Sequence, residues 1–246
     1  MGVVYVLGTE RVIDYSPLPQ GKIIPVSQKP RKLWLNVAVF STVLFVVLNL
    51  YTFFQEGSYG LHAVSDSLAD TAVVLIGLSM ALSSICYFWD FADTKIIYRK
   101  DLGLCGFAFA LAHGTMALFF LEEFSFPTYY LSQSAIMPFT FGLLSLLIYT
   151  GMAVIANRHA IHVLGGELWR LLLRVGYLAY FYSILHFSLI MYPDWITWGE
   201  KHETFFPPPS FLLFLFAVSI LLLRVALFIA QVSKKNSIFL DKGEKT

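Results

Sequence analysis

The stretch RKDLGLCGFAFALAHGTMALFF, residues 99–120, decides the fold class of this chain. A basic pair opens the stretch, and a run of about twenty mostly apolar residues follows, which is the length that a helix needs to cross a bilayer. One ionisable side chain, His113, lies deep inside that run. A polar group at this depth is costly unless something binds it, so His113 is a candidate functional residue.

The composition of the whole chain is typical of a polytopic membrane protein. Of the 246 residues, 57% are hydrophobic, 17% are aromatic and only 13% are charged, and the mean hydropathy is +0.69. A soluble domain has about a quarter of charged residues. The formal net charge of +1 says little about partners, and we expect a lipid bilayer and no nucleic acid around this chain.

Six apolar runs are long enough to span a bilayer. We expect them at residues 34–54, 67–89, 102–121, 134–156, 168–191 and 208–230. The sequence therefore predicts an all-α integral membrane protein, a bundle of six transmembrane helices. We expect three parts: an N-terminal segment (1–33), the six-helix domain (34–232) and a C-terminal tail (233–246).

The distribution of basic residues predicts the orientation of the bundle. Lys and Arg lie in both terminal segments and in the second and fourth loops, whereas the first and third loops have none and the fifth has only Lys201. Because basic loops stay on the cytoplasmic side, we expect both termini to be cytoplasmic. Arg224 interrupts the sixth run, where it either marks the inner end of the span or holds an anion in an inner cavity.

A second histidine, His186 in YFYSILHFSLI, lies in the fifth apolar run. His113 is thirteen residues after Lys100, about 20 Å along a helix axis, and His186 is sixteen residues after Arg170, about 24 Å. Counted from the other side, Glu122 lies nine residues after His113, and Asp194 eight after His186. Both histidines are therefore expected in the outer half of the bilayer at nearly equal depth, as two axial ligands of one haem require.

Each histidine also has a simpler interpretation, an interhelical hydrogen bond to a residue such as Ser134, Ser183 or Tyr149. For one intramembrane histidine this interpretation is the better one, but for a depth-matched pair we favour haem. Glycines on the third run, Gly106 and Gly114 among them, could let a flat macrocycle approach, although ordinary helix packing explains them equally well.

The residues around both histidines resemble a known family. Arg99-Lys100-Asp101-Leu102-Gly103-Leu104 followed by His113 resembles the R-R-x-L-G-L…H signature of the ferric-reductase-like transmembrane domain family, in its MsrQ/YedZ-like form. Leu164-Gly165, Trp169, Tyr177 and His186 are similar to the family's second conserved segment. The resemblance covers residues 34–224, and it implies a b-type cytochrome in a six-helix bundle.

One departure from the family pattern limits what the resemblance implies. Family members place a histidine after the helix-five tryptophan, where this chain has Leu173. The resemblance therefore implies a single outer haem b, with His113 and His186 as its iron ligands. Electrons from the inner side would need a bridge to this haem, either a flavin or a quinone near Arg99, Arg174 and Arg224 or another redox subunit. Alternatively, the donor and the acceptor both act at the outer face.

The sequence thus predicts a membrane cytochrome subunit that passes electrons through or along the bilayer. It contains no NAD(P)H or flavin domain, so the electron donor would be a redox partner protein or quinol, and whether the chain is itself an enzyme stays open. The alternative is a non-catalytic anchor or accessory subunit of a larger redox complex, with residues 1–33 as a docking arm. A solute transporter is a weaker alternative, because no helix has a Gly/Pro-interrupted break at the midplane. The expected location is the bacterial cytoplasmic membrane.

Overall fold

A computed structural model of the protein describes residues 30–56, 59–121, 128–201 and 207–243. All of the regular structure in these ranges is helical. The elements are α1 (Pro30–Glu56), α2 (Leu61–Phe88), the 3₁₀ helix η1 (Asp90–Tyr98), α3 (Arg99–Phe119), α4 (Ile136–Ile155), α5 (Arg158–Leu164), α6 (Gly166–Arg174), α7 (Gly176–Lys201) and α8 (Pro209–Gly243).

The expectation of six membrane-spanning helices is confirmed. Six helical segments of the described chain are long and apolar enough to cross a bilayer: α1, α2, η1 with α3, α4, α6 with α7, and α8. The chain is therefore an integral, multi-pass membrane protein with an all-helical described part. The cytoplasmic placement of both termini stays a prediction from the basic loops.

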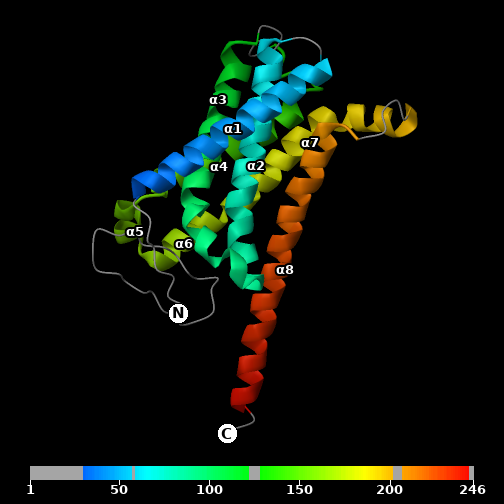
Figure 1. The fold of residues 1–246 in the computed structure, drawn as a ribbon. Helices are drawn as coiled ribbons and strands as arrows, with labels where there is room; N and C mark the ends of the chain where they lie inside the picture. The colour runs from blue at the N-terminus through cyan, green and yellow to red at the C-terminus, as the bar shows by residue number, and fades with distance from the viewer. Residues whose placement is uncertain (1–29, 57–58, 122–127, 202–206, 244–246) are drawn as a thin grey trace.

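Helix α2 is the centre of the bundle. In the apolar stretch of 18 residues that marks each span, 61% of the residues of α2 are buried, against 22% or less in every other span. The reason is that α2 packs against α1, α3, α7 and α8 at once, as its central position shows (Figure 1). Small and hydroxylated residues such as Ser67 and Thr71 face these neighbours and donate to carbonyls of their own helix, which permits close packing in a membrane.

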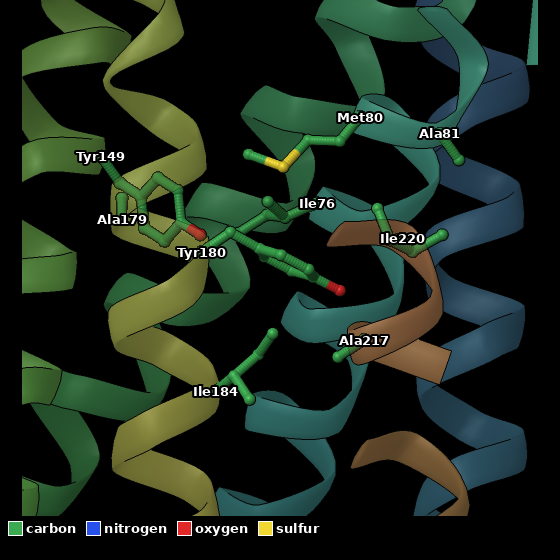
Figure 2. Close-up of a cluster of buried hydrophobic side chains, with 9 residues drawn as sticks. All are labelled: Ile76, Met80, Ala81, Tyr149, Ala179, Tyr180, Ile184, Ala217 and Ile220. Carbon is green, nitrogen blue, oxygen red and sulfur yellow. The ribbon is translucent and has the colours of Figure 1, made fainter. Parts of the chain in front are cut away.

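The largest buried apolar cluster joins α2 to α4, α7 and α8 (Figure 2). Tyr180 of α7 is fully buried there, and its hydroxyl donates to the carbonyl of Val73 at 3.2 Å. A Cβ on Gly77 would lie 2.5 Å from that hydroxyl and 2.9 Å from the ring of Phe216. Only glycine at position 77 therefore lets α7 and α8 approach α2 this closely.

The fifth span differs from the expected single helix over residues 168–191. The chain forms the short helix α6, breaks at Val175 and then begins the long helix α7 at Gly176. Helix α6 is amphipathic, because Glu167, Arg170 and Arg174 recur at helical spacing on one face. The apolar leucines between them made this segment look like the start of a span.

Other helix ends also differ from the expected limits. Helix α2 begins six residues earlier, at Leu61, and α7 continues through Pro193 to Lys201, ten residues beyond the expected end of the fifth run at residue 191. Helix α8 continues through the expected tail to Gly243 and runs past the ends of the other helices (Figure 1). The predicted docking arm lies outside the described residues except for positions 30–33.

Candidate functional site

The structure brings the two predicted histidines together. His113 of α3 and His186 of α7 have ring centroids 6.5 Å apart, and their ring planes are inclined by 67°. Both side chains are half-buried between helices. The expectation that the two side chains lie next to one another is therefore confirmed, and a haem between them stays a prediction.

His113 is held by the first turns of α2. Its Nδ1 lies 2.9 Å from the backbone carbonyl oxygen of Ser65 and 3.0 Å from the hydroxyl oxygen of the same residue. Ser65 is buried and is the fifth residue of α2. The residue four positions later is Ala69. Its small side chain leaves the carbonyl of Ser65 open to His113 of α3.

His186 is held in the same way by α4. Its Nδ1 lies 2.7 Å from the backbone carbonyl oxygen of Pro138, the third residue of that helix. The residue four positions later is Gly142, and a Cβ there would lie only 2.8 Å from Nδ1 of His186. Glycine at position 142 thus makes room for the imidazole above the carbonyl that anchors it.

These contacts fix the protonation pattern of both rings. A carbonyl oxygen can only accept a hydrogen bond, so Nδ1 must carry the proton in each neutral imidazole. The other nitrogen, Nε2, then presents a lone pair, and no hydrogen bond to either Nε2 occurs within the described residues. A backbone carbonyl on Nδ1 with a free Nε2 is the arrangement of a metal-ligating histidine.

The separation of the rings also suits a shared metal. With metal–Nε2 bonds of about 2.0–2.1 Å and roughly 1.1 Å from Nε2 to the ring centroid, ligands on opposite sides of one metal have centroids about 6.3 Å apart. The observed 6.5 Å is close to that value. The described residues contain no group of three or more His, Cys, Asp or Glu side chains that could hold a metal ion. A metal held by the pair would therefore need further ligands besides the side chains of the described residues.

The structure gives different acceptors for the histidines from those that the sequence suggested. Ser183 instead bonds to Ser145 at 2.6 Å and lies 3.5 Å from the hydroxyl of Tyr149, while Ser134 lies 3.3 Å from Ser132. The interhelical hydrogen bonds of the histidines exist, but the acceptors are backbone carbonyls, and they use only one nitrogen of each ring.

The predicted glycines lie in other contacts. A Cβ on Gly106 would lie 2.7 Å from the side chain of Ile76 and 3.0 Å from its backbone nitrogen, so Gly106 serves the packing of α3 on α2. A Cβ on Gly114 would meet Leu146 of α4 at 3.1 Å. Gly142, which sequence reasoning missed, is the glycine in contact with a histidine of the pair. Its position four residues after Pro138 was the available signal.

The three predicted arginines lie at the end of the bundle away from the histidine pair. We call this end the basic end and define it by Arg99, Arg174 and Arg224. Arg224 of α8 lies over the ring of Tyr177, 4.3 Å from its centroid, and the charges of Arg99 and Arg174 both act on it. The basic end and the histidine pair are thus separate. His113 is fourteen residues after Arg99 on α3, about 21 Å along the axis.

No family model matches the sequence, and no curated protein matches it. What this chain does must therefore be inferred from its own residues.

Proposed function

We propose that this protein is a membrane cytochrome subunit that holds one haem b between His113 and His186. The single observation that carries the proposal is the paired geometry: two imidazoles 6.5 Å apart, each with Nδ1 occupied by a backbone carbonyl. His113 and His186 would hold the haem iron through Nε2, and the porphyrin would supply the remaining ligands.

The protein's own part in this function is to orient two ligands and to control access. When bound, the haem supplies reversible one-electron chemistry. The carbonyls of Ser65 and Pro138 hold both imidazoles neutral and fix their tilt, and hydrogen bonds of this kind raise the basicity of a ligating nitrogen. The surrounding helices keep the pair in an apolar environment, which with the axial ligands sets the redox potential.

The electron donor is proposed to be separate from the helical bundle that the described residues form. A redox partner protein or a quinol is the proposed donor, with a flavin or quinone near the basic end as the proposed bridge across the bilayer. Under the positive-inside rule the basic end is cytoplasmic and the histidines lie in the outer half. The proposed location is the bacterial cytoplasmic membrane.

The test is a reduced-minus-oxidised optical spectrum with haem quantitation on the purified protein. We expect one b-type haem per chain, absent from His113→Ala and from His186→Ala. The matched control is His162→Ala, which removes an exposed histidine on α5. Two haems per chain, or a full complement in either variant of the pair, would refute the two-ligand site.

One observation favours the alternative function of a non-catalytic anchor. Helix α8 continues beyond the other helices (Figure 1), and such a projection suits attachment of a further subunit. The same spectrum separates the two functions. A folded wild-type protein that takes up no haem, even when haem is supplied during expression, would leave the anchor as the better explanation.

A further inference from the structure

Arg224 is held at the basic end by groups that do not neutralise it. Its guanidinium covers the ring of Tyr177 of α7 at 4.3 Å, and Nη1 donates a long hydrogen bond of 3.4 Å to the hydroxyl of Ser83 of α2. A guanidinium has five N–H donors. Neither contact provides an anion, and the buried hydroxyl of Tyr177 has no hydrogen-bond partner among the described residues.

The charges around Arg224 are of the same sign. Arg99 and Arg174 act on it, and no carboxylate is among the groups that do so in the described part of the chain. Three arginines in one place repel one another unless an anion lies among them.

The position of the cluster in the bundle indicates where such an anion would come from. Ser83 lies five residues before the end of α2, Arg99 begins α3, and Tyr177 is the second residue of α7. The cluster is thus at the level of the helix ends, where lipid headgroups lie. Arg174 is exposed at the end of the amphipathic helix α6, so a headgroup could reach it from the bilayer.

We propose that Arg174 and Arg224, with Arg99 beside them, form a phosphate-binding site that takes the headgroup of an anionic phospholipid. The planar fork of arginine matches phosphate oxygens in two parallel hydrogen bonds, which a lysine cannot reproduce. Basic pockets between transmembrane helices on the cytoplasmic side are typical sites for such headgroups. This site does not rest on haem binding by the histidine pair, and a phospholipid headgroup bound there would take the place of the flavin offered above as the bridge.

The experiment measures lipid binding to the intact, delipidated protein by native mass spectrometry during titration with phosphatidylglycerol, with phosphatidylcholine as the neutral lipid. We expect a preference for phosphatidylglycerol that falls roughly tenfold or more in Arg224→Gln, because hydrogen bonds to charged groups are worth that much in affinity. Arg174→Gln should also lower the preference for phosphatidylglycerol. Arg224→Lys keeps the charge and should restore only part of the affinity.

The matched control is Arg170→Gln, one turn before Arg174 on the same helix, because Arg170 is not among the charges that act on Arg224. Equal preference for phosphatidylglycerol in all variants would overturn the proposal. Arginine-dependent binding of inorganic phosphate or flavin mononucleotide, without any preference for phosphatidylglycerol, would instead assign the site to a soluble phosphate and overturn the lipid source. Arg174→Gln changes an exposed side chain, so it keeps the test valid if Arg224→Gln does not fold.

Discussion

Replacing Gly142 by alanine directly tests the contacts that hold the His186 imidazole in place. The added Cβ would lie 2.8 Å from Nδ1, 3.0 Å from Cε1 and 3.2 Å from Cγ of the imidazole, whereas ordinary van der Waals contact begins at 3.4 Å. The ring would therefore have to move by about 0.6 Å. The Nδ1 to Pro138 carbonyl distance, now 2.7 Å, would lengthen to about 3.3 Å, beyond the usual range for this bond.

The energetic cost of this movement can be given from general values. A weakened hydrogen bond costs about 1 kcal/mol, and the added methyl in a filled site costs about 1–3 kcal/mol. Alanine in a helix returns roughly 0.5–1 kcal/mol relative to glycine. The remainder is about 1–3.5 kcal/mol, and the part of it that falls on the haem-bound state lowers haem affinity about tenfold for every 1.4 kcal/mol.

The assay is haem titration of the apoprotein, followed by visible absorption. Gly142→Ala should bind haem about tenfold more weakly. Part of the bound haem should no longer have the absorption spectrum of haem with two histidine ligands. The control is Gly151→Ala on the same helix, where nothing lies within 4 Å of the added Cβ; it should keep the affinity and gain slightly in stability. Wild-type haem affinity in Gly142→Ala would refute the reasoning that position 142 seats the histidine.

Two further predictions concern stability. Gly77→Ala should lower the free energy of unfolding by about 1–3 kcal/mol, because its Cβ would meet Tyr180 and Phe216; an unchanged melting temperature in detergent would contradict the packing of α2. Burial raises the pKa of Tyr130 to about 12, and its hydroxyl donates to the carbonyl of Ala117 at 2.7 Å. Because the unfolded pKa is about 10, this contribution to stability is complete below pH 10 and is lost as pH rises through 12. A melting series over pH 9–12 should show a larger fall in melting temperature in the wild type than in Tyr130→Phe.

The spans and the histidine pair could be predicted from the sequence because both depend on hydrophobic length. A helix that crosses a bilayer must be apolar over about twenty residues, and depth follows from counting along its axis. The count for His186 from Arg170 ran through the break before α7, which begins at Gly176. The counts predicted nearly equal depths for the two histidines, and the structure brings their ring centroids to 6.5 Å from each other.

The break between α6 and α7 could not be read from average hydropathy. The leucines of residues 168–173 keep the average high although the segment is amphipathic. Its signal was the spacing of Glu167, Arg170 and Arg174 at i, i+3 and i+7, the period of a one-sided polar face. The acceptors of the histidines were harder to predict, because a backbone carbonyl has no side-chain signature and is marked only by the small residue four positions later.

The open nitrogens of the histidine pair argue for a ligand between the two rings. A histidine that only joins two helices gains most when both of its nitrogens are bonded. Here two neighbouring imidazoles each satisfy Nδ1 through a carbonyl on another helix, and no hydrogen bond to either Nε2 occurs among the described residues. Neither Nε2 is among the described side-chain atoms that are buried without a partner, so both are open to a ligand. A Lewis acid bound by both lone pairs would use them together, and for that reason we propose haem iron there.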